Sequence, residues 1–223
     1  IYQLQNDPED RLFQLRNDDR MFAKYNGLAF EVKKRMSNNW QANFGMTLSK
    51  SEGRLGSSSA RSLPTGSQTS TAGIFGQNPN EFINTDGRLQ SDRPVVIKAQ
   101  FVYQLPWNML TSFNFQSQSG KPIYENLRVA TSATNIPGAS SILANVADGD
   151  LRTVQWTTID ARVEKAFALG GPAELTVFKD FLNLFNSDTT ENVETNRIGT
   201  DNYLVPSRFI LPRRLMVGGK FRF

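Results

Sequence analysis

Cysteine and histidine are both absent from this 223-residue sequence. Without cysteine, the chain can form no disulfide, no thiolate nucleophile and no cysteine-based metal site. Without histidine, it lacks the usual zinc ligands, the Ser–His catalytic pair and the commonest general base. We therefore expect no enzyme activity, no cofactor and no bound metal.

Long hydrophobic runs are missing as well. No stretch of about 18 apolar residues, the length that a membrane-spanning helix requires, occurs in the sequence. The hydrophobic share of 39% lies below the usual value for soluble domains. Both facts argue against a helical membrane protein. They are compatible with a membrane barrel, because only every second residue of a barrel strand faces lipid.

The charge balance is basic, with a formal net charge of +4 and a sequence pI of about 9.4. Such a balance can signal binding to nucleic acid. Here the basic residues are scattered, and the only runs are Lys33-Lys34-Arg35 and Arg213-Arg214. We expect these charges to face an aqueous lumen or a membrane edge, and we expect no nucleic-acid partner.

The terminal stretch Leu215–Phe223 alternates between two kinds of residue. One side carries Leu215, Val217, Gly219, Phe221 and Phe223, and the other side is mostly charged. A period of two predicts a β-strand. An exposed aromatic strand at the end of a soluble domain would promote aggregation. A strand with one face in lipid and one in a wet lumen has this pattern.

Seven segments of about ten residues alternate in the same way, and ten residues is the length of a tilted membrane strand. They lie near residues 28–36, 40–49, 95–104, 109–118, 159–167, 174–186 and 215–223. The connections alternate between short turns and long loops. The short turns are 37–39, 105–108 and 169–172, and the long loops are about 52–92, 121–152 and 187–208.

Long structureless loops are uncommon in a compact soluble domain. Short periplasmic turns and long extracellular loops are the rule in outer-membrane barrels. The fold class that we predict is therefore all-β, a transmembrane antiparallel β-barrel. A soluble β-sandwich is the alternative, but it does not readily give a strict alternation of short and long connections.

Several motifs resemble one protein family. Residues 180–186 (DFLNLFN) resemble a segment near the C-terminus of TonB-dependent outer-membrane transporters, and residues 162–167 resemble the strand before it. Residues 118–122 (QSGKP) look like a strand-end motif of that family. Residues 25–28 with 34–41 look like hairpins of its Oar-like branch. The resemblance covers most of the chain from about Tyr25 onward.

This resemblance implies that residues 1–223 are the C-terminal portion of one barrel domain of roughly 22 strands, of which this chain supplies about seven. Ile1–Leu4 is expected to end the strand before them. The plug domain and the TonB-contacting segment are expected to lie outside this chain. The implied function is uptake of a nutrient such as a peptide, glycan or metal chelate across the outer membrane of a Gram-negative bacterium.

The implied partners are outer-membrane lipid and lipopolysaccharide, the barrel-assembly machinery, and TonB through the absent N-terminal part. Two other functions remain open on the sequence: a small passive outer-membrane channel, and a structural or adhesive surface barrel. A closed barrel formed by these residues alone would favour the passive channel.

The end of the chain also resembles the signal that the barrel-assembly machinery reads. Gly218, Phe221 and Phe223 match its glycine and its two aromatic residues, whereas Met216 stands where a polar residue is expected. An exposed terminal strand can pair with a receptive edge and be selected through alternate side chains. The other interpretation is that Phe221 and Phe223 only belong to an aromatic girdle.

Further residues are assigned by their position on the expected strands. Trp40, Trp107 and Phe167 lie at or beside short turns and are predicted to form the periplasmic aromatic girdle. Six charges are predicted to face the lumen: Lys98, Asp160, Arg162, Glu164, Lys220 and Arg222. Asp160, Arg162, Glu164 and Glu174 could form a glycosidase-like carboxylate pair with an arginine. We favour a cross-strand ladder of ion pairs.

Three smaller patterns each have two interpretations. Asn183 and Asn186 could bind a ligand, but we favour Asn186 as the residue that ends its strand through local hydrogen bonds. Asp148-Gly149-Asp150 could begin a calcium loop, but it lacks the remaining ligands, so we favour a turn. Substrate contacts are expected from the long loops, with Phe75 and Tyr124 at their tips.

Overall fold

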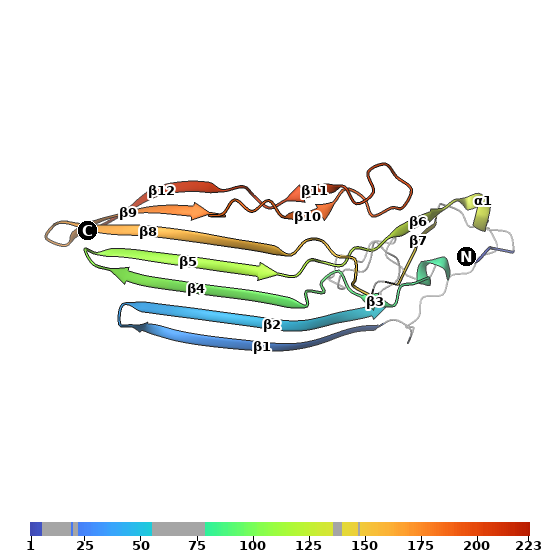
Figure 1. Cartoon of the computed structure of the whole chain (residues 1–223), viewed down its shortest axis with the longest axis horizontal. Helices are drawn as coiled ribbons and strands as arrows, with labels where there is room; N and C mark the ends of the chain where they lie inside the picture. Colours follow the sequence, from blue (N-terminus) through green and yellow to red (C-terminus); the bar gives the residue numbers. More distant parts are fainter. Residues whose placement is uncertain (6–18, 20–21, 55–78, 136–139, 147) are drawn as a thin grey trace.

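The computed structural model describes residues 1–5, 19, 22–54, 79–135, 140–146 and 148–223, which form an all-β structure (Figure 1). Seven long strands lie in one antiparallel sheet in the order β1-β2-β4-β5-β8-β9-β12, and β3 pairs with β2. The strands are β1 (Phe22–Ser37), β2 (Trp40–Arg54), β3 (Gly87–Arg88), β4 (Val95–Leu105), β5 (Met109–Gln118), β8 (Trp156–Gly170), β9 (Ala173–Leu182) and β12 (Arg214–Arg222).

The seven strands predicted from the period of two are thereby confirmed, as are the short turns between them. Asn38 and Asn39, in the turn between β1 and β2, have φ angles of 51° and 65°. Trp107 and Asn108, in the turn between β4 and β5, have φ angles of 62° and 56°. Positive φ at two successive residues is typical of the tight turns that suit a twisted hairpin. We call this end of the sheet the turn end and the opposite end the loop end.

The long connections are more ordered than the sequence suggested. The loop end carries two short antiparallel pairs, β6 with β7 and β10 with β11. The additional elements are β6 (Asn126–Val129), β7 (Ser140–Leu143), β10 (Thr190–Val193), β11 (Pro206–Phe209), the 3₁₀ helix η5 (Pro79–Phe82) and the helix α1 (Thr131–Thr134). The prediction of structureless loops was wrong here, because Tyr124 and Leu143 form a small buried core. Within the part of the chain that the structure describes, no helix is both long and apolar enough to cross a membrane.

The sheet has two faces of opposite character. Directly paired residues share a face, so Arg162 lies on the same face as its partners Ser112 and Asp180. We call this the polar face. The other face, the apolar face, carries large side chains that are exposed. They include Leu28, Phe30, Val32, Phe44, Leu48, Phe101, Phe113, Val163, Val177, Leu215, Val217 and Phe221.

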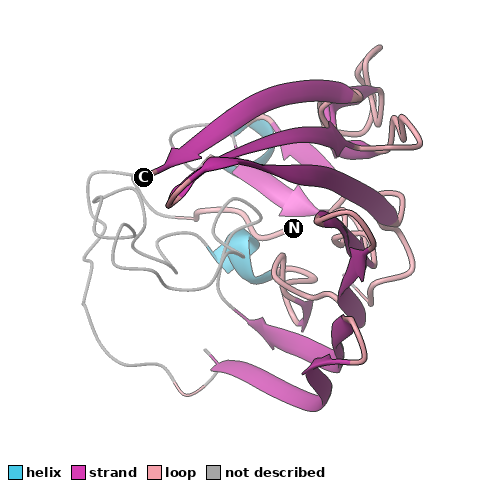
Figure 2. Cartoon of the chain, turned by 90° about the vertical axis from the view of Figure 1, so that its left-hand side faces the viewer, coloured by secondary structure: helices cyan, strands magenta, loops and turns pink. Residues whose placement is uncertain are grey.

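The sheet is curved and open. Figure 2 shows it bent into an arc, with the two edge strands at the ends of the arc. The edge strands are β1 and β12, and each has one partner strand among the described residues. The described strands therefore do not close into a barrel.

Two predicted boundaries need correction. The sixth strand was expected to reach Asn186, but β9 ends at Leu182 because Asn183 adopts a φ of 51°. Ile1–Leu4 was expected to end a strand of the sheet, but it is not a strand. Instead, Tyr2 exchanges hydrogen bonds with the buried side chain of Asn80, and the Leu4 amide donates to the Thr134 carbonyl.

Candidate functional site

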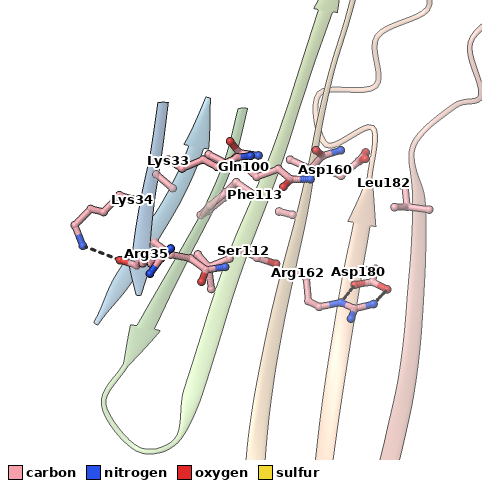
Figure 3. Close-up of a pocket in the computed structure, with 16 residues that line it drawn as sticks. Lys33, Lys34, Arg35, Gln100, Ser112, Phe113, Asp160, Arg162, Asp180 and Leu182 are labelled. Atoms are coloured by element: carbon pink, nitrogen blue, oxygen red, sulfur yellow. Dashed lines mark hydrogen bonds and ion pairs between the residues drawn. The ribbon is translucent and has the colours of Figure 1, made fainter. Parts of the chain in front are cut away.

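An open groove of about 570 Å³ runs across the polar face from β1 to β9 (Figure 3). Its lining combines amide, hydroxyl and charged side chains. The polar members are Lys33, Lys34, Arg35, Gln41, Asn43, Gln100, Ser112, Asn114, Asp160, Arg162 and Asp180. Because one groove is lined by residues of six successive strands, from β1 to β9, the polar face is the concave side of the arc. A concave surface rich in donors and acceptors can hold a hydrophilic solute.

The strongest polar contact in the groove is an ion pair between β8 and β9. Arg162 Nε donates to Asp180 Oδ1 at 2.5 Å, and Arg162 Nη2 donates to Asp180 Oδ2 at 2.7 Å. Figure 3 shows the two side chains facing each other in this bidentate arrangement. The arrangement orients the guanidinium plane as well as neutralising its charge. The sequence analysis missed Asp180 as the partner of Arg162.

The other predicted carboxylates have different surroundings. Asp160 Oδ1 accepts a hydrogen bond from the Asn183 backbone amide at 2.8 Å, which holds the end of β9 against β8. Glu164 lies opposite Phe178, and Glu174 lies opposite Arg222. Arg162 therefore pairs with Asp180, and not with the carboxylates that the sequence analysis grouped with it.

The remaining predicted charges lie on the polar face. Lys98 on β4 lies between Gly45 and Gln116, and Lys220 on β12 lies opposite Thr176. Lys220 Nζ is 5.6 Å from the centre of the Phe178 ring, and the Arg162 guanidinium is 4.5 Å from it. Two cations thus lie against one aromatic ring, which is a favourable electrostatic contact.

Two further hollows extend the groove toward the loop end. The middle hollow, of about 430 Å³, shares Asp160 and Leu182 with the groove. A smaller pocket of about 220 Å³ shares Trp156, Glu191 and Arg208 with the middle hollow. The three spaces therefore lie in succession from the loop end toward the turn end, and we call this succession of hollows the track.

A buried ion cluster holds the loop end together. Asp92 is fully buried and lies 2.6 Å from Arg152 Nη2 and 3.7 Å from Arg88 Nη1. It also accepts a hydrogen bond from the Ser51 backbone amide at 2.6 Å. The cluster joins the end of β2 to the segments before β4 and before β8. No local pattern in the sequence marks the cluster, because Ser51 and Arg152 are 41 and 60 residues from Asp92.

Of the two residues expected at exposed loop tips, Tyr124 is buried. Tyr124 is only 5% exposed, and its hydroxyl donates to the Arg88 carbonyl at 3.0 Å, so it belongs to the loop core. Phe75 lies outside the described residues. Nearby, the Tyr203 hydroxyl bonds to the Glu125 carboxylate, and burial together with this contact raises the pKa of Tyr203 to about 12.

The predicted aromatic girdle residues all lie at the turn end. Trp40 begins β2, and Lys34 Nζ is 3.9 Å from its ring centre. Phe167 lies near the end of β8, and Lys165 Nζ is 5.4 Å from its ring centre. Trp107 lies in the turn and is 77% exposed. Rings beside lysines suit a boundary between an apolar and an aqueous phase.

Two residues of the expected assembly signal, Gly218 and Phe221, lie on opposite faces of β12, and the third, Phe223, follows its end. Phe221 and Phe223 are 58% and 92% exposed, and their ring centres are 5.8 Å apart. Gly218 lies on the polar face directly opposite Phe178. A Cβ atom on Gly218 would come within 2.4 Å of the Phe178 ring. A larger residue at position 218 would displace this ring, so Gly218 has a packing role independently of any role in a signal.

The asparagine and aspartate patterns are structural in the described chain. Asn183, rather than Asn186, ends the strand. Its side-chain Nδ2 donates to the Ser187 and Leu211 carbonyls, and its side-chain Oδ1 accepts from the Ser187 backbone amide. Asp148 Oδ1 accepts from the Asp150 amide at 3.0 Å, which makes the favoured turn. Among the described residues, no group of three or more acidic side chains is placed to hold a metal ion.

No family model matches the sequence, and no curated protein matches it either.

Proposed function

We propose that this chain forms the C-terminal part of an outer-membrane β-barrel that takes up a nutrient by TonB-dependent transport. The observation that carries the proposal is the division of one curved sheet into an exposed apolar face and a polar face with a succession of hollows. Burial of apolar side chains in lipid stabilises by about 25 cal/mol per Å² of surface removed from water. The same sheet in water would leave this entire face unfavourably hydrated.

The open arc supports a larger barrel. An unpaired strand edge in lipid leaves backbone groups without partners, and each costs several kcal/mol. β1 and β12 would therefore pair with further strands, in a barrel of roughly 22 with a plug inside. In this arrangement the turn end is periplasmic, the loop end is extracellular, and the polar face lines the lumen. The solute would bind at the loops and follow the track once the plug moves.

Single cysteines would test the membrane location, since these 223 residues contain no cysteine. Asn43 and Phe44 are neighbours on opposite faces of β2. We expect Asn43→Cys to react with a hydrophilic maleimide in intact outer membranes, and Phe44→Cys to react only after solubilisation. Equal labelling of both variants in membranes would contradict a lipid-facing apolar face.

Uptake by cells would test the transport function. Cells that express the full-length protein should accumulate a labelled peptide, glycan or metal chelate, and accumulation should stop when TonB is deleted. A steady conductance of the purified full-length protein in planar bilayers, with no need for TonB, would instead favour the passive channel.

The terminal aromatic pair gives a separate prediction. The double variant Phe221→Ala, Phe223→Ala should reduce the amount of full-length protein assembled in the outer membrane severalfold, because the assembly machinery would lose alternate side chains that it reads. Quantitative immunoblots of outer-membrane fractions would measure the amount. The control is Phe30→Ala, Phe44→Ala, which removes two exposed rings from the same apolar face. An equal loss in both variants would show that only lipid contact matters.

A further inference from the structure

The small pocket at the loop end of the track is basic. Three cations line it, Arg93, Lys121 and Arg208, and the carboxylate in the lining is Glu191. The pocket opens on the polar face, since Gln118 and Trp156, which also line it, are paired on that face. Trp156 lines both this pocket and the middle hollow.

Neighbouring carboxylates neutralise this charge only in part. Glu191 Oε2 is 3.4 Å from Arg208 Nε, and the two side chains are 39% and 76% exposed, so this pair is weak. Asp92 forms an ion pair with Arg152 and accepts a hydrogen bond from the Ser51 backbone amide. Arg93 Nη1 donates to the Asp92 backbone carbonyl, and Lys121 Nζ donates to the Asn192 side-chain oxygen at 3.0 Å. Both of these acceptors are uncharged.

The positively charged side chains of the pocket repel one another. Burial lowers the pKa of Lys121, and the positive charge of Arg93 lowers it further, although Glu191 acts in the opposite direction. Burial also lowers the pKa of Arg93, and the neighbouring Arg152 adds to the effect, although Asp92 acts in the opposite direction. Partly buried like charges are destabilising until an anion joins them. Such perturbed groups in a pocket point to a binding role.

The backbone holds Lys121 in place. Its amide donates to Thr153 Oγ1 at 3.0 Å, and its carbonyl accepts from the Thr153 amide at 2.9 Å. Gly120 allows this close approach, because a Cβ atom there would lie 1.6 Å from the Thr153 carbonyl oxygen. A constrained backbone reduces the conformational entropy lost on binding to that of the side chain alone.

We propose that the pocket lined by Arg93, Lys121 and Arg208 binds the carboxylate or phosphate groups of an anionic solute. A volume of about 220 Å³ is suited to one small oxyanion group or a compact polycarboxylate, rather than to a drug-sized molecule. The position at the loop end makes it the first site on the track, an inference that rests on the proposed transport function. Bidentate Arg contacts and a Lys point charge are the usual means of holding such groups.

Equilibrium titration of the full-length protein in detergent micelles with citrate, and separately with inorganic phosphate, tests the proposal. Citrate should bind with an affinity that falls with added salt. Lys121→Gln should weaken binding about tenfold, the effect of losing one charge-assisted hydrogen bond. Arg208→Gln should weaken it less, because Arg208 is more exposed. Lys98→Gln is the matched control, since Lys98 lies on the same face and outside this pocket, and it should leave binding unchanged.

Three results would overturn the proposal. The first is no binding of citrate or phosphate by the unaltered protein. The second is an equal affinity of the Lys121→Gln and Lys98→Gln variants. The third is binding only to phosphatidylglycerol vesicles, which would indicate a lipid site. If the variants bind citrate in the expected order but cells show no TonB-dependent uptake, the anion site stands and the transport function is wrong. If cells show uptake but the protein does not bind citrate or phosphate, the transport function stands and the anion site is wrong.

Discussion

Replacing Gly120 by alanine should destabilise the protein by about 3–5 kcal/mol, a loss that only a few mechanisms produce. The added Cβ would lie 1.6 Å from the Thr153 carbonyl oxygen and 2.5 Å from its carbonyl carbon. The obstacle is backbone, so no side-chain rotation relieves it. The segments that follow β5 and precede β8 would have to separate, and the bonds between Lys121 and Thr153 would break.

Urea unfolding of the full-length protein in micelles, followed by tryptophan fluorescence, would measure the loss. Gly45→Ala is the matched control, because a Cβ on Gly45 would be 3.9 Å from its nearest neighbour, the Phe30 carbonyl oxygen. We expect this control to remain within about 1 kcal/mol of the unaltered protein. A Gly120→Ala variant as stable as the control would show that the two segments are not in contact.

Asp92→Asn should cost about 3–5 kcal/mol, the usual effect of removing one partner of a buried ion pair. The side chain keeps its shape, and its oxygen can still accept from the Ser51 amide, so the loss reports on charge. Arg152 is only 18% exposed and would be left beside an uncharged amide. Because the cluster joins three segments of the loop end, we also expect faster limited proteolysis there.

Asp86→Asn is the control for this prediction. Asp86 pairs with Arg54 at 3.1 Å, but the two side chains are 53% and 30% exposed. Exposed pairs contribute about 0–1 kcal/mol, so unfolding in urea should hardly change. Similar losses in both variants would mean that Asp92 is hydrated in solution and that its burial has no consequence for stability.

Periodicity predicted the strands well because a period of two is a local property of the sequence. The partner of Arg162 could also have been identified from the sequence, by taking the position of the turn into account. The turn between β8 and β9 centres on Gly171, and Arg162 and Asp180 are both nine residues from it. Counting outward from the turn would have placed the two charges opposite each other. The favoured ladder of cross-strand ion pairs had the right kind of contact, but it grouped Arg162 with Asp160, Glu164 and Glu174 because no register had been assigned to the strands.

The loop end was less predictable for a physical reason. The contacts of Asp92, Arg152 and Tyr124 join segments that are far apart in sequence, and no periodicity marks them. Tyr124 was expected at an exposed tip because its neighbours are polar, yet it is buried with Leu143. The basic pocket has the same origin, since Arg93, Lys121 and Arg208 come from three separate connections.

Gly218 beneath the Phe178 ring has a consequence for the register of the last strand. A shift of β12 by two residues along β9 would keep its apolar and charged side chains on the same faces, so the hydrophobic pattern does not exclude that register. Such a shift would place Met216 or Lys220 opposite Phe178, and the ring would have to move, because even a Cβ atom at position 218 comes within 2.4 Å of it. The glycine therefore favours the observed register of β12 over a register shifted by two residues. In the observed register the Phe178 ring contacts both Arg162 and Lys220, and these contacts add to the stability of that register.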